Sequence, residues 1–181
     1  DAQPLSDVVF TGVSADTGEA TVSTATLTFT AENWSTPQTV TVTGVDDSID
    51  DGNQNTTITI AVDDGNSDNA FDGLADQTVT ATTTDNDTAA YTLSTTTASV
   101  TEAGSTATFT VVLDTQPTSN VVFTVASADT DEATVSPTPL TFTNGNWDTP
   151  QTVTVTGVDD SIDDGNQDTT ITIAVDDDNS D

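Results

Sequence analysis

The chain has 181 residues, with 31 Asp or Glu and no Lys, Arg or His, which gives a formal net charge of −31. Because no side chain is cationic, no surface can hold phosphate groups, and we expect neither nucleic acid nor an anionic membrane as a partner. Cysteine is absent too, so no His, Cys or Lys can serve as a base or nucleophile, an isolated Ser has no such partner, and we expect no enzyme. The apolar runs are short, so no membrane insertion is expected.

The residue types predict an all-β fold. Thr is abundant and favours strands, whereas Asp, Asn and Gly favour turns. Apolar residues alternate with Thr in short runs that turn residues separate, which is typical of half-buried strands. In the second half of the chain the predicted strands are Tyr91–Ser94, Ala98–Thr101, Ala107–Leu113, Val121–Ala126, Ala133–Val135, Leu140–Thr143, Gln151–Val158 and Thr169–Val175. The expected core of that half is Phe109, Val111, Phe123, Phe142, Trp147, Val153, Val155, Ile171 and Ile173.

An internal repeat determines the expected domain organisation. Residue n matches residue n + 113, with 54 of 68 aligned positions identical, and residues 36–54 equal residues 149–167 throughout. A spacing of 113 residues suits a β-sandwich rather than one turn of a solenoid. We therefore expect tandem immunoglobulin-like β-sandwiches, with residues 1–87 in the first repeat and residues 88–181 in the second.

Both expected sandwiches are incomplete in this window. The first repeat has no counterpart of Tyr91–Leu113, which holds the opening strands of the second. The second repeat has no counterpart of Asn69–Asp87, which closes the first. Two explanations remain open. The chain is a piece of a longer protein, which is the simpler expectation, or neighbouring chains complete the sheets by donating strands.

A strongly acidic loop, Gly44–Gln54, lies between two alternating runs and returns unchanged as Gly157–Gln167. Each copy places four carboxylates within six residues, and no cationic side chain exists to balance them. Calcium is a hard cation that takes about six to eight oxygen ligands, and several loops at one end of a sandwich can supply them. We therefore expect calcium to bind there. The alternative is that these Asp residues form turns and a solvated surface.

Several segments of the repeat resemble a Calx-beta domain. They are Val100–Gly104, Ala107–Val111, Asn146–Val155 and the acidic loop, and the first repeat adds Asp85–Asp87, which is similar to the acidic cluster that ends such domains. The resemblance implies an immunoglobulin-like sandwich that binds calcium at one end. In the first repeat it implies as ligands Asp16, Asp46, Asp47, Asp50, Asp51, Asp85 and Asp87. In the second repeat it implies Glu102, Asp129 or Asp131, Asp159, Asp160, Asp163 and Asp164.

These observations predict a structural function. We expect a calcium-stiffened spacer of a large extracellular adhesin or surface fibre, on the bacterial cell surface or secreted, with an ion near Asp85–Asp87 where the repeats join. Its expected partners are calcium, neighbouring repeats of the same chain and identical chains in a fibre. Two alternatives remain: a self-assembling extracellular filament whose chains share strands, and a carbohydrate- or ice-binding module that uses Thr-rich rows such as Thr39–Thr43.

Overall fold

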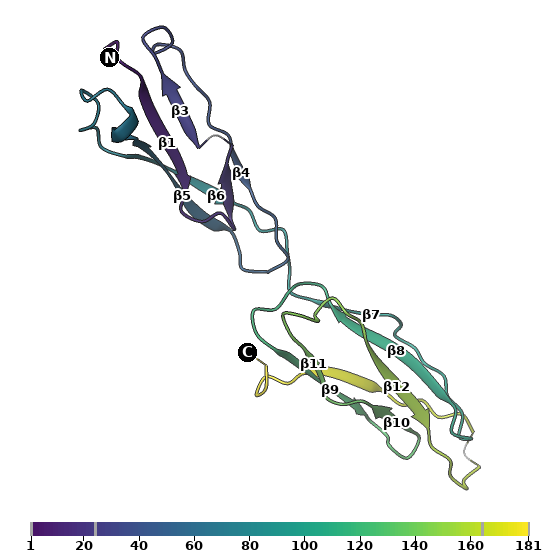
Figure 1. Cartoon of the computed structure of the whole chain (residues 1–181). Coiled ribbons are helices and arrows are strands. Elements are labelled where there is room, and N and C mark those ends of the chain that lie inside the picture. Colours follow the sequence, from purple (N-terminus) through teal and green to yellow (C-terminus); the bar gives the residue numbers. More distant parts are fainter. Residues whose placement is uncertain (1, 24, 164, 181) are drawn as a thin grey trace. The chain divides into compact units, whose positions relative to one another are not determined.

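The chain forms two compact units built from β-strands (Figure 1). The computed structural model describes residues 2–23, 25–163 and 165–180. Unit 1 comprises Asp1–Asp47 and Asp51–Asp85, and unit 2 comprises Ser48–Asp50 and Asn86–Asp181. Within the described ranges the regular elements are antiparallel strands and a short 3-10 helix, which confirms the predicted all-β sandwich class. In the same ranges, no helix is long and apolar enough to cross a membrane.

Unit 1 contains a larger and a smaller antiparallel sheet. Its elements are β1 (Val8–Ser14), β2 (Ala20–Val22), β3 (Thr26–Phe29), β4 (Val42–Gly44), β5 (Gln54–Val62), the 3-10 helix η1 (Asp64–Asn66) and β6 (Gln77–Thr83). The larger sheet has the strand order β3-β1-β5-β6, and the smaller one pairs β2 with β4. The sequence favours these strands because Val and Ile alternate with Thr, which gives each strand one apolar face.

Unit 2 also contains two antiparallel sheets, and here both have at least three strands. Its elements are β7 (Tyr91–Leu93), β8 (Thr106–Leu113), β9 (Val121–Ser127), β10 (Ala133–Ser136), β11 (Leu140–Phe142), β12 (Gln151–Gly157) and β13 (Ile171–Val175). One sheet has the order β10-β12-β8-β7, and the other has the order β11-β9-β13.

The sequence repeat is also a repeat of strand register. β1 pairs with β5 through Phe10↔Val62, and β9 pairs with β13 through the equivalent residues Phe123↔Val175. The pairing of β2 with β4 likewise matches that of β10 with β12 in register. Each strand of unit 1 from β1 to β5 therefore has its equivalent in unit 2. β6 has no equivalent among the described residues of unit 2, and β7 and β8 have none among those of unit 1.

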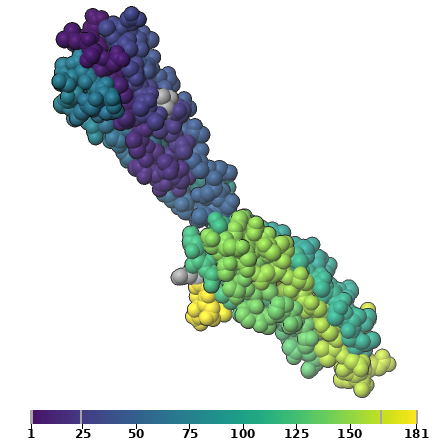
Figure 2. All heavy atoms as spheres, in the orientation of Figure 1, coloured from purple at the N-terminus to yellow at the C-terminus, as the bar shows by residue number. Residues whose placement is uncertain are grey.

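The carboxylate of Asp68 holds the first residues of unit 1 against the segment that follows β5. Its Oδ1 accepts a hydrogen bond from the N–H of Ala70 (3.0 Å), and its Oδ2 accepts from the N–H groups of Leu5 (2.7 Å) and Ser6 (3.2 Å). These hydrogen bonds, that of Ala70 first, lower the pKa of Asp68 below its usual value. Figure 2 shows the contact, where the teal atoms that follow β5 lie against the purple atoms of the N-terminal segment.

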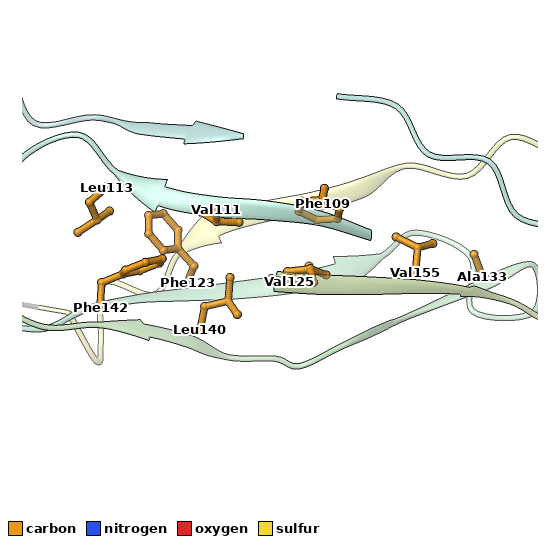
Figure 3. Close-up of a cluster of buried hydrophobic side chains, with 10 residues drawn as sticks. Phe109, Val111, Leu113, Phe123, Val125, Ala133, Leu140, Phe142 and Val155 are labelled. Carbon is orange, nitrogen blue, oxygen red and sulfur yellow. The ribbon is translucent and has the colours of Figure 1, made fainter. Parts of the chain in front are cut away.

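Unit 2 has a continuous apolar core between its sheets. Val111 and Leu113 of β8 belong to the same core cluster as Phe123 and Phe142, and Figure 3 shows Leu113 close to both Phe side chains. The Phe123 ring packs edge-on against Phe142, with centroids 6.0 Å apart, and against Tyr91 of β7 at 4.9 Å. The predicted core is confirmed: Phe109, Val111, Phe123, Phe142, Val153 and Val155 are buried, and Trp147, Ile171 and Ile173 pack against them. Leu113, Val125, Ala133 and Leu140 join this core without having been predicted.

The predicted strand Ala98–Thr101 is wrong. These residues do not form a strand, and they lead into a turn. The N–H of Gly104 donates to the C=O of Thr101 (3.1 Å), and the N–H of Thr101 donates to the Oγ of Ser105 (2.7 Å). These bonds use backbone groups that a sheet would need, and the left-handed φ of 79° at Gly104 favours glycine. The local turn bonds therefore override the alternating pattern.

The run of alternating Thr and Val that precedes the acidic loop is identical in the two repeats, but it is more deeply buried in unit 2 than in unit 1. In unit 2 it forms β12, which lies between β10 and β8, and Val155 is only 3% exposed. In unit 1 it forms only the short β4, and the equivalent Val42 is 38% exposed. β4 pairs with β2 along one edge, and none of the described strands pairs with its other edge.

Replacing the two equivalent valines by alanine tests this difference. Val155→Ala should lower the free energy of unfolding of unit 2 by about 2 kcal/mol, because it removes buried methyl groups and leaves a cavity. Val42→Ala should cost unit 1 less than about 0.5 kcal/mol, because this side chain is already in contact with water.

Each unit contains one tryptophan, Trp34 in unit 1 and Trp147 in unit 2, so fluorescence can follow the two units separately. Urea unfolding is measured in the Trp147→Phe background for unit 1 and in the Trp34→Phe background for unit 2. Equal losses of stability at the two valines would contradict the difference in burial.

Candidate functional site

Three segments of unit 1 meet at one end of the unit, around the backbone of Glu19. The C=O of Glu19 accepts a hydrogen bond from the N–H of Val45 (2.8 Å), at the start of the acidic loop. It also accepts one from the Oγ1 of Thr83 (2.8 Å), at the end of β6. On the same loop, the N–H of Asp16 donates to the Oγ1 of Thr56 in β5 (3.0 Å). The β1–β2 loop, the acidic loop and the end of β6 therefore lie together.

The carboxylate of Glu19 is influenced by the charges of other carboxylates. Its side chain is half-buried. Its pKa is raised above the usual value of 4.5, first by burial and then by the charges of Asp51, Asp47, Asp16 and Asp85. All four Asp residues are among the ligands predicted for the first repeat, and they lie near enough to Glu19 for their charges to raise its pKa. Glu19 itself was not predicted.

Backbone hydrogen bonds position two of these carboxylates. The Oδ2 of Asp85 accepts from the N–H of Gly52 (2.7 Å), and the N–H of Asp85 donates to the Oδ1 of Asn53 (3.0 Å). Gly52 adopts a left-handed φ of 76°, which favours glycine and lets the acidic loop turn back toward β6. The Oδ1 of Asp16 accepts from the N–H of Gly18 (2.9 Å) and closes a tight turn. The loop geometry thus directs acidic side chains toward the same end of the unit.

Three other residues predicted as ligands in the first repeat are not among the charges that raise the pKa of Glu19. Asp46 is exposed in the acidic loop. Asp50 belongs to unit 2, where its Oδ2 accepts a hydrogen bond from the N–H of Ala89 (2.8 Å). Asp87 also belongs to unit 2 and is half-buried. The predicted set therefore divides between the two units.

Unit 2 repeats the arrangement of loops. The C=O of Glu132, the equivalent of Glu19, accepts a hydrogen bond from the N–H of Val158 (2.9 Å). The turn that carries Glu102 comes to the same end, because the N–H of Gly157 donates to the C=O of Ser105 (3.1 Å). The acidic loop, the loop after β9 and the turn before β8 therefore converge in this unit.

The residues predicted as ligands in unit 2 lie in these loops. The Oδ1 of Asp129 accepts from the N–H of Asp131 (3.0 Å), and the Oδ1 of Asp160 accepts from the N–H of Ile162 (2.7 Å). Both bonds close tight turns within a loop. The side chains exposed to solvent are Glu102, Asp129, Asp131, Asp159, Asp160 and Asp163, and Asp164 lies outside the described residues.

The chemistry of these loops fits calcium, although the side chains are not gathered around a single point. Carboxylate and carbonyl oxygens are the ligands that calcium prefers. Burial first, and then the negative charges of nearby Asp residues, raise the pKa of Glu19, and a bound cation would lower that pKa. Among the described residues, however, no three acidic side chains stand close enough together to hold an ion. Binding would therefore require exposed Asp side chains to turn toward Glu19.

A signal in the sequence could have identified Glu19. Glu is rare in this chain, and Glu19 and Glu132 occupy the same position of the two repeats. By contrast, Glu32 is replaced by Gly145 in the second repeat. The prediction instead followed the density of Asp residues in the acidic loop and the resemblance to Calx-beta domains, and neither selected Glu19.

No known protein-family model matches the chain, and no curated protein matches it either. The similarity to Calx-beta domains therefore rests on the sequence segments quoted above. The functional interpretation rests in turn on the chemistry of the loops around Glu19 and Glu132.

Without divalent cations, unit 1 should become more stable as the pH falls from neutrality toward 4.5. A carboxyl group whose pKa is higher in the folded state binds its proton more tightly there, so its contribution to stability is lost as the pH rises through the folded-state pKa. Glu19→Gln should remove this dependence. Asp68, whose pKa is lowered, makes the opposite contribution only below about 3.8.

Unfolding of the Trp147→Phe variant in EDTA, followed through Trp34 from pH 7 to pH 4, measures the effect. Glu32→Gln is the matched control, because Glu32 is exposed in the loop after β3. If the pH dependence survives Glu19→Gln, or if Glu32→Gln removes it equally well, Glu19 is not its source.

Proposed function

We propose that the chain is a repeated spacer of a large extracellular adhesin or surface fibre, whose units are stabilised by calcium at one end. The observation that carries the proposal is the position of Glu19, a half-buried glutamate whose pKa is raised first by burial and then by the charges of four Asp residues, in a chain without cationic side chains. Repulsion of this kind destabilises the folded unit unless a cation enters from solution.

Tandem repetition supports the mechanical part of the proposal. The two units share strand register as well as sequence, and the acidic loop occurs at the same place in each. A spacer needs rigid modules of one kind, and it needs no catalytic group. The absence of cysteine and the abundance of Asp and Thr agree with a protein of the bacterial cell surface better than with a disulfide-stapled secreted domain.

The alternative of carbohydrate or ice binding has less support. It requires a row of Thr side chains presented by a regular strand. In unit 1 the strand β4 begins only at Val42, so the first part of the row Thr39–Thr43 is not a strand. No observation in the described residues favours this alternative over the spacer.

Calcium should raise the stability of both units, and EDTA should abolish the effect. At a free calcium concentration a hundredfold above Kd, a single site contributes about 2.7 kcal/mol to the free energy of unfolding. Thermal unfolding in calcium, magnesium and EDTA at matched ionic strength checks this, because nonspecific screening acts equally for both divalent ions. Equal melting temperatures in all three solutions would exclude a specific site.

Substitutions confined to one unit separate the proposed calcium sites of unit 1 and unit 2. In unit 1, Glu19→Gln should abolish the calcium effect seen through Trp34 while it leaves the unit as stable as before, or more so, in EDTA. In unit 2, the double change Asp159→Asn with Asp160→Asn should abolish the effect seen through Trp147 and leave unit 1 unaffected. Glu32→Gln should change neither. Loss of stability in EDTA after Glu19→Gln would show that this residue supports the fold by itself.

A further inference from the structure

The chain contains Asn-x-Ser/Thr tripeptides, or sequons, at Asn33-Trp34-Ser35, Asn55-Thr56-Thr57 and Asn86-Asp87-Thr88. In proteins that reach the cell exterior, such a tripeptide is the acceptor for an N-linked oligosaccharide when it lies in an accessible surface segment. The tripeptide alone does not distinguish one sequon from another. The structure does, because it places them in a turn, in a strand and in an irregular segment.

The carboxamide of Asn33 holds a turn together. Its Oδ1 accepts a hydrogen bond from the N–H of Thr30 (2.6 Å), and its Nδ2 donates to the C=O of Thr28 (3.3 Å). The equivalent Asn146 of unit 2 makes the same two bonds, at 2.6 and 3.4 Å, although no sequon occurs there. This asparagine therefore serves the turn with or without a sequon, and a sugar on its Nδ2 would compete with the bond to Thr28.

Asn55 lies inside a strand. It belongs to β5 and pairs with Thr82 of β6, whose Oγ1 donates a hydrogen bond to the Oδ1 of Asn55 (2.6 Å). The next residue, Thr56, is only 3% exposed, and its Oγ1 accepts from the N–H of Asp16 (3.0 Å). A transferase that binds the whole tripeptide has to detach it from the sheet, so this sequon requires local unfolding of β5.

Asn86 lies in an irregular segment, residues 84–90, which follows β6 and precedes β7. Asn86 and Thr88 are exposed, whereas Asp87 between them is half-buried. This alternation puts the two residues that define the sequon on the same, solvent-facing side of the segment. Among the described residues, no group is hydrogen-bonded to the carboxamide of Asn86. A transferase can therefore reach this sequon without unfolding any strand.

We propose that Asn86 of unit 2 is an acceptor for an N-linked oligosaccharide. In the transfer, the Nδ2 of Asn86 bonds to the anomeric carbon of an oligosaccharide that is carried on a lipid diphosphate. The bond between that carbon and the diphosphate oxygen breaks, the lipid diphosphate leaves with the bonding electrons, and the nitrogen loses one proton to a base of the transferase. The proposal rests on the extracellular location proposed above, but it does not depend on calcium binding.

A sugar on Asn86 is compatible with the acidic loops. The half-buried Asp87 lies on the opposite side of the segment, so the sugar extends into solvent and away from this carboxylate. A neutral oligosaccharide also adds no charge to a chain whose net charge is already −31. The calcium-induced rise in melting temperature should therefore be the same for the glycosylated and the unglycosylated chain.

Peptide mapping by mass spectrometry tests the proposal on the protein isolated from the cells that make it. An oligosaccharide should be found on Asn86, and none on Asn33 or Asn55. The Asn86→Gln variant should lose the oligosaccharide, and the matched variant Asn55→Gln should keep it.

A second measurement uses the purified full chain with an oligosaccharyltransferase and a lipid-linked oligosaccharide, beside synthetic peptides of the same sequons. For each sequon, the rate in the folded chain is divided by the rate in its peptide, which removes the sequence preference of the enzyme. This ratio should be near unity for Asn86. It should be at least about tenfold lower for Asn33 and Asn55, because these sequons become accessible only through local unfolding.

The proposal is overturned if the natural protein carries no oligosaccharide on Asn86, or if the transferase modifies the Asn86 peptide but not the folded chain. Equal ratios at the three sequons would show that the structure does not select Asn86. Melting of the Asn86→Gln variant in calcium and in EDTA keeps this proposal separate from the calcium-stabilised spacer. A normal calcium effect together with absent glycosylation would contradict only the glycosylation of Asn86.

Discussion

In unit 2, β8 lies along β12 from Gln151↔Val111 to Thr156↔Thr106, and the rest of the sandwich depends on this pairing. It completes a four-stranded sheet and presents the apolar face of β8 to the strands of the opposite sheet. Burial of these side chains is the main favourable contribution to stability in so small a unit. In unit 1 the sequence identical to β12 has no such neighbour among the described strands, and Val42, Phe10 and Phe29 stay partly hydrated.

The distribution of charge follows from the same architecture. In a chain without cationic side chains no acid can be neutralised by an ion pair, so strands that enter the core must be uncharged and the acids must lie in loops. The alternation of Thr with Val keeps the strands uncharged, and the acidic loop keeps the acids out of the core. The cost is seen at the loop end of unit 1, where burial and then the charges of nearby Asp residues raise the pKa of Glu19. A divalent cation is the simplest group from solution that could relieve it.

The candidate site could be predicted in part. The density of acids in Gly44–Gln54 located the loop, and the resemblance to Calx-beta domains selected Asp16 and Asp85 from distant segments. The structure places these two with Asp47 and Asp51 around one glutamate. Glu19 was missed because it stands alone in the sequence, and only the packing of the β1–β2 loop on the end of β6 brings it next to the other acids. Asp46 and Asp50 could not be separated from their neighbours by sequence, because the direction of each side chain depends on the path of the loop.

The sequence by itself determined the all-β class, the 113-residue repeat, the position of most strands and the apolar residues of the core, because these depend on alternation and on turn residues that act locally. It failed at Ala98–Thr101, where bonds within a turn outweigh alternation. Only the tertiary structure decided that Val155 is buried whereas the equivalent Val42 is exposed. Residues 36–54 and 149–167 have the same sequence, so nothing local distinguishes them, and the difference comes from a partner strand far away in the chain.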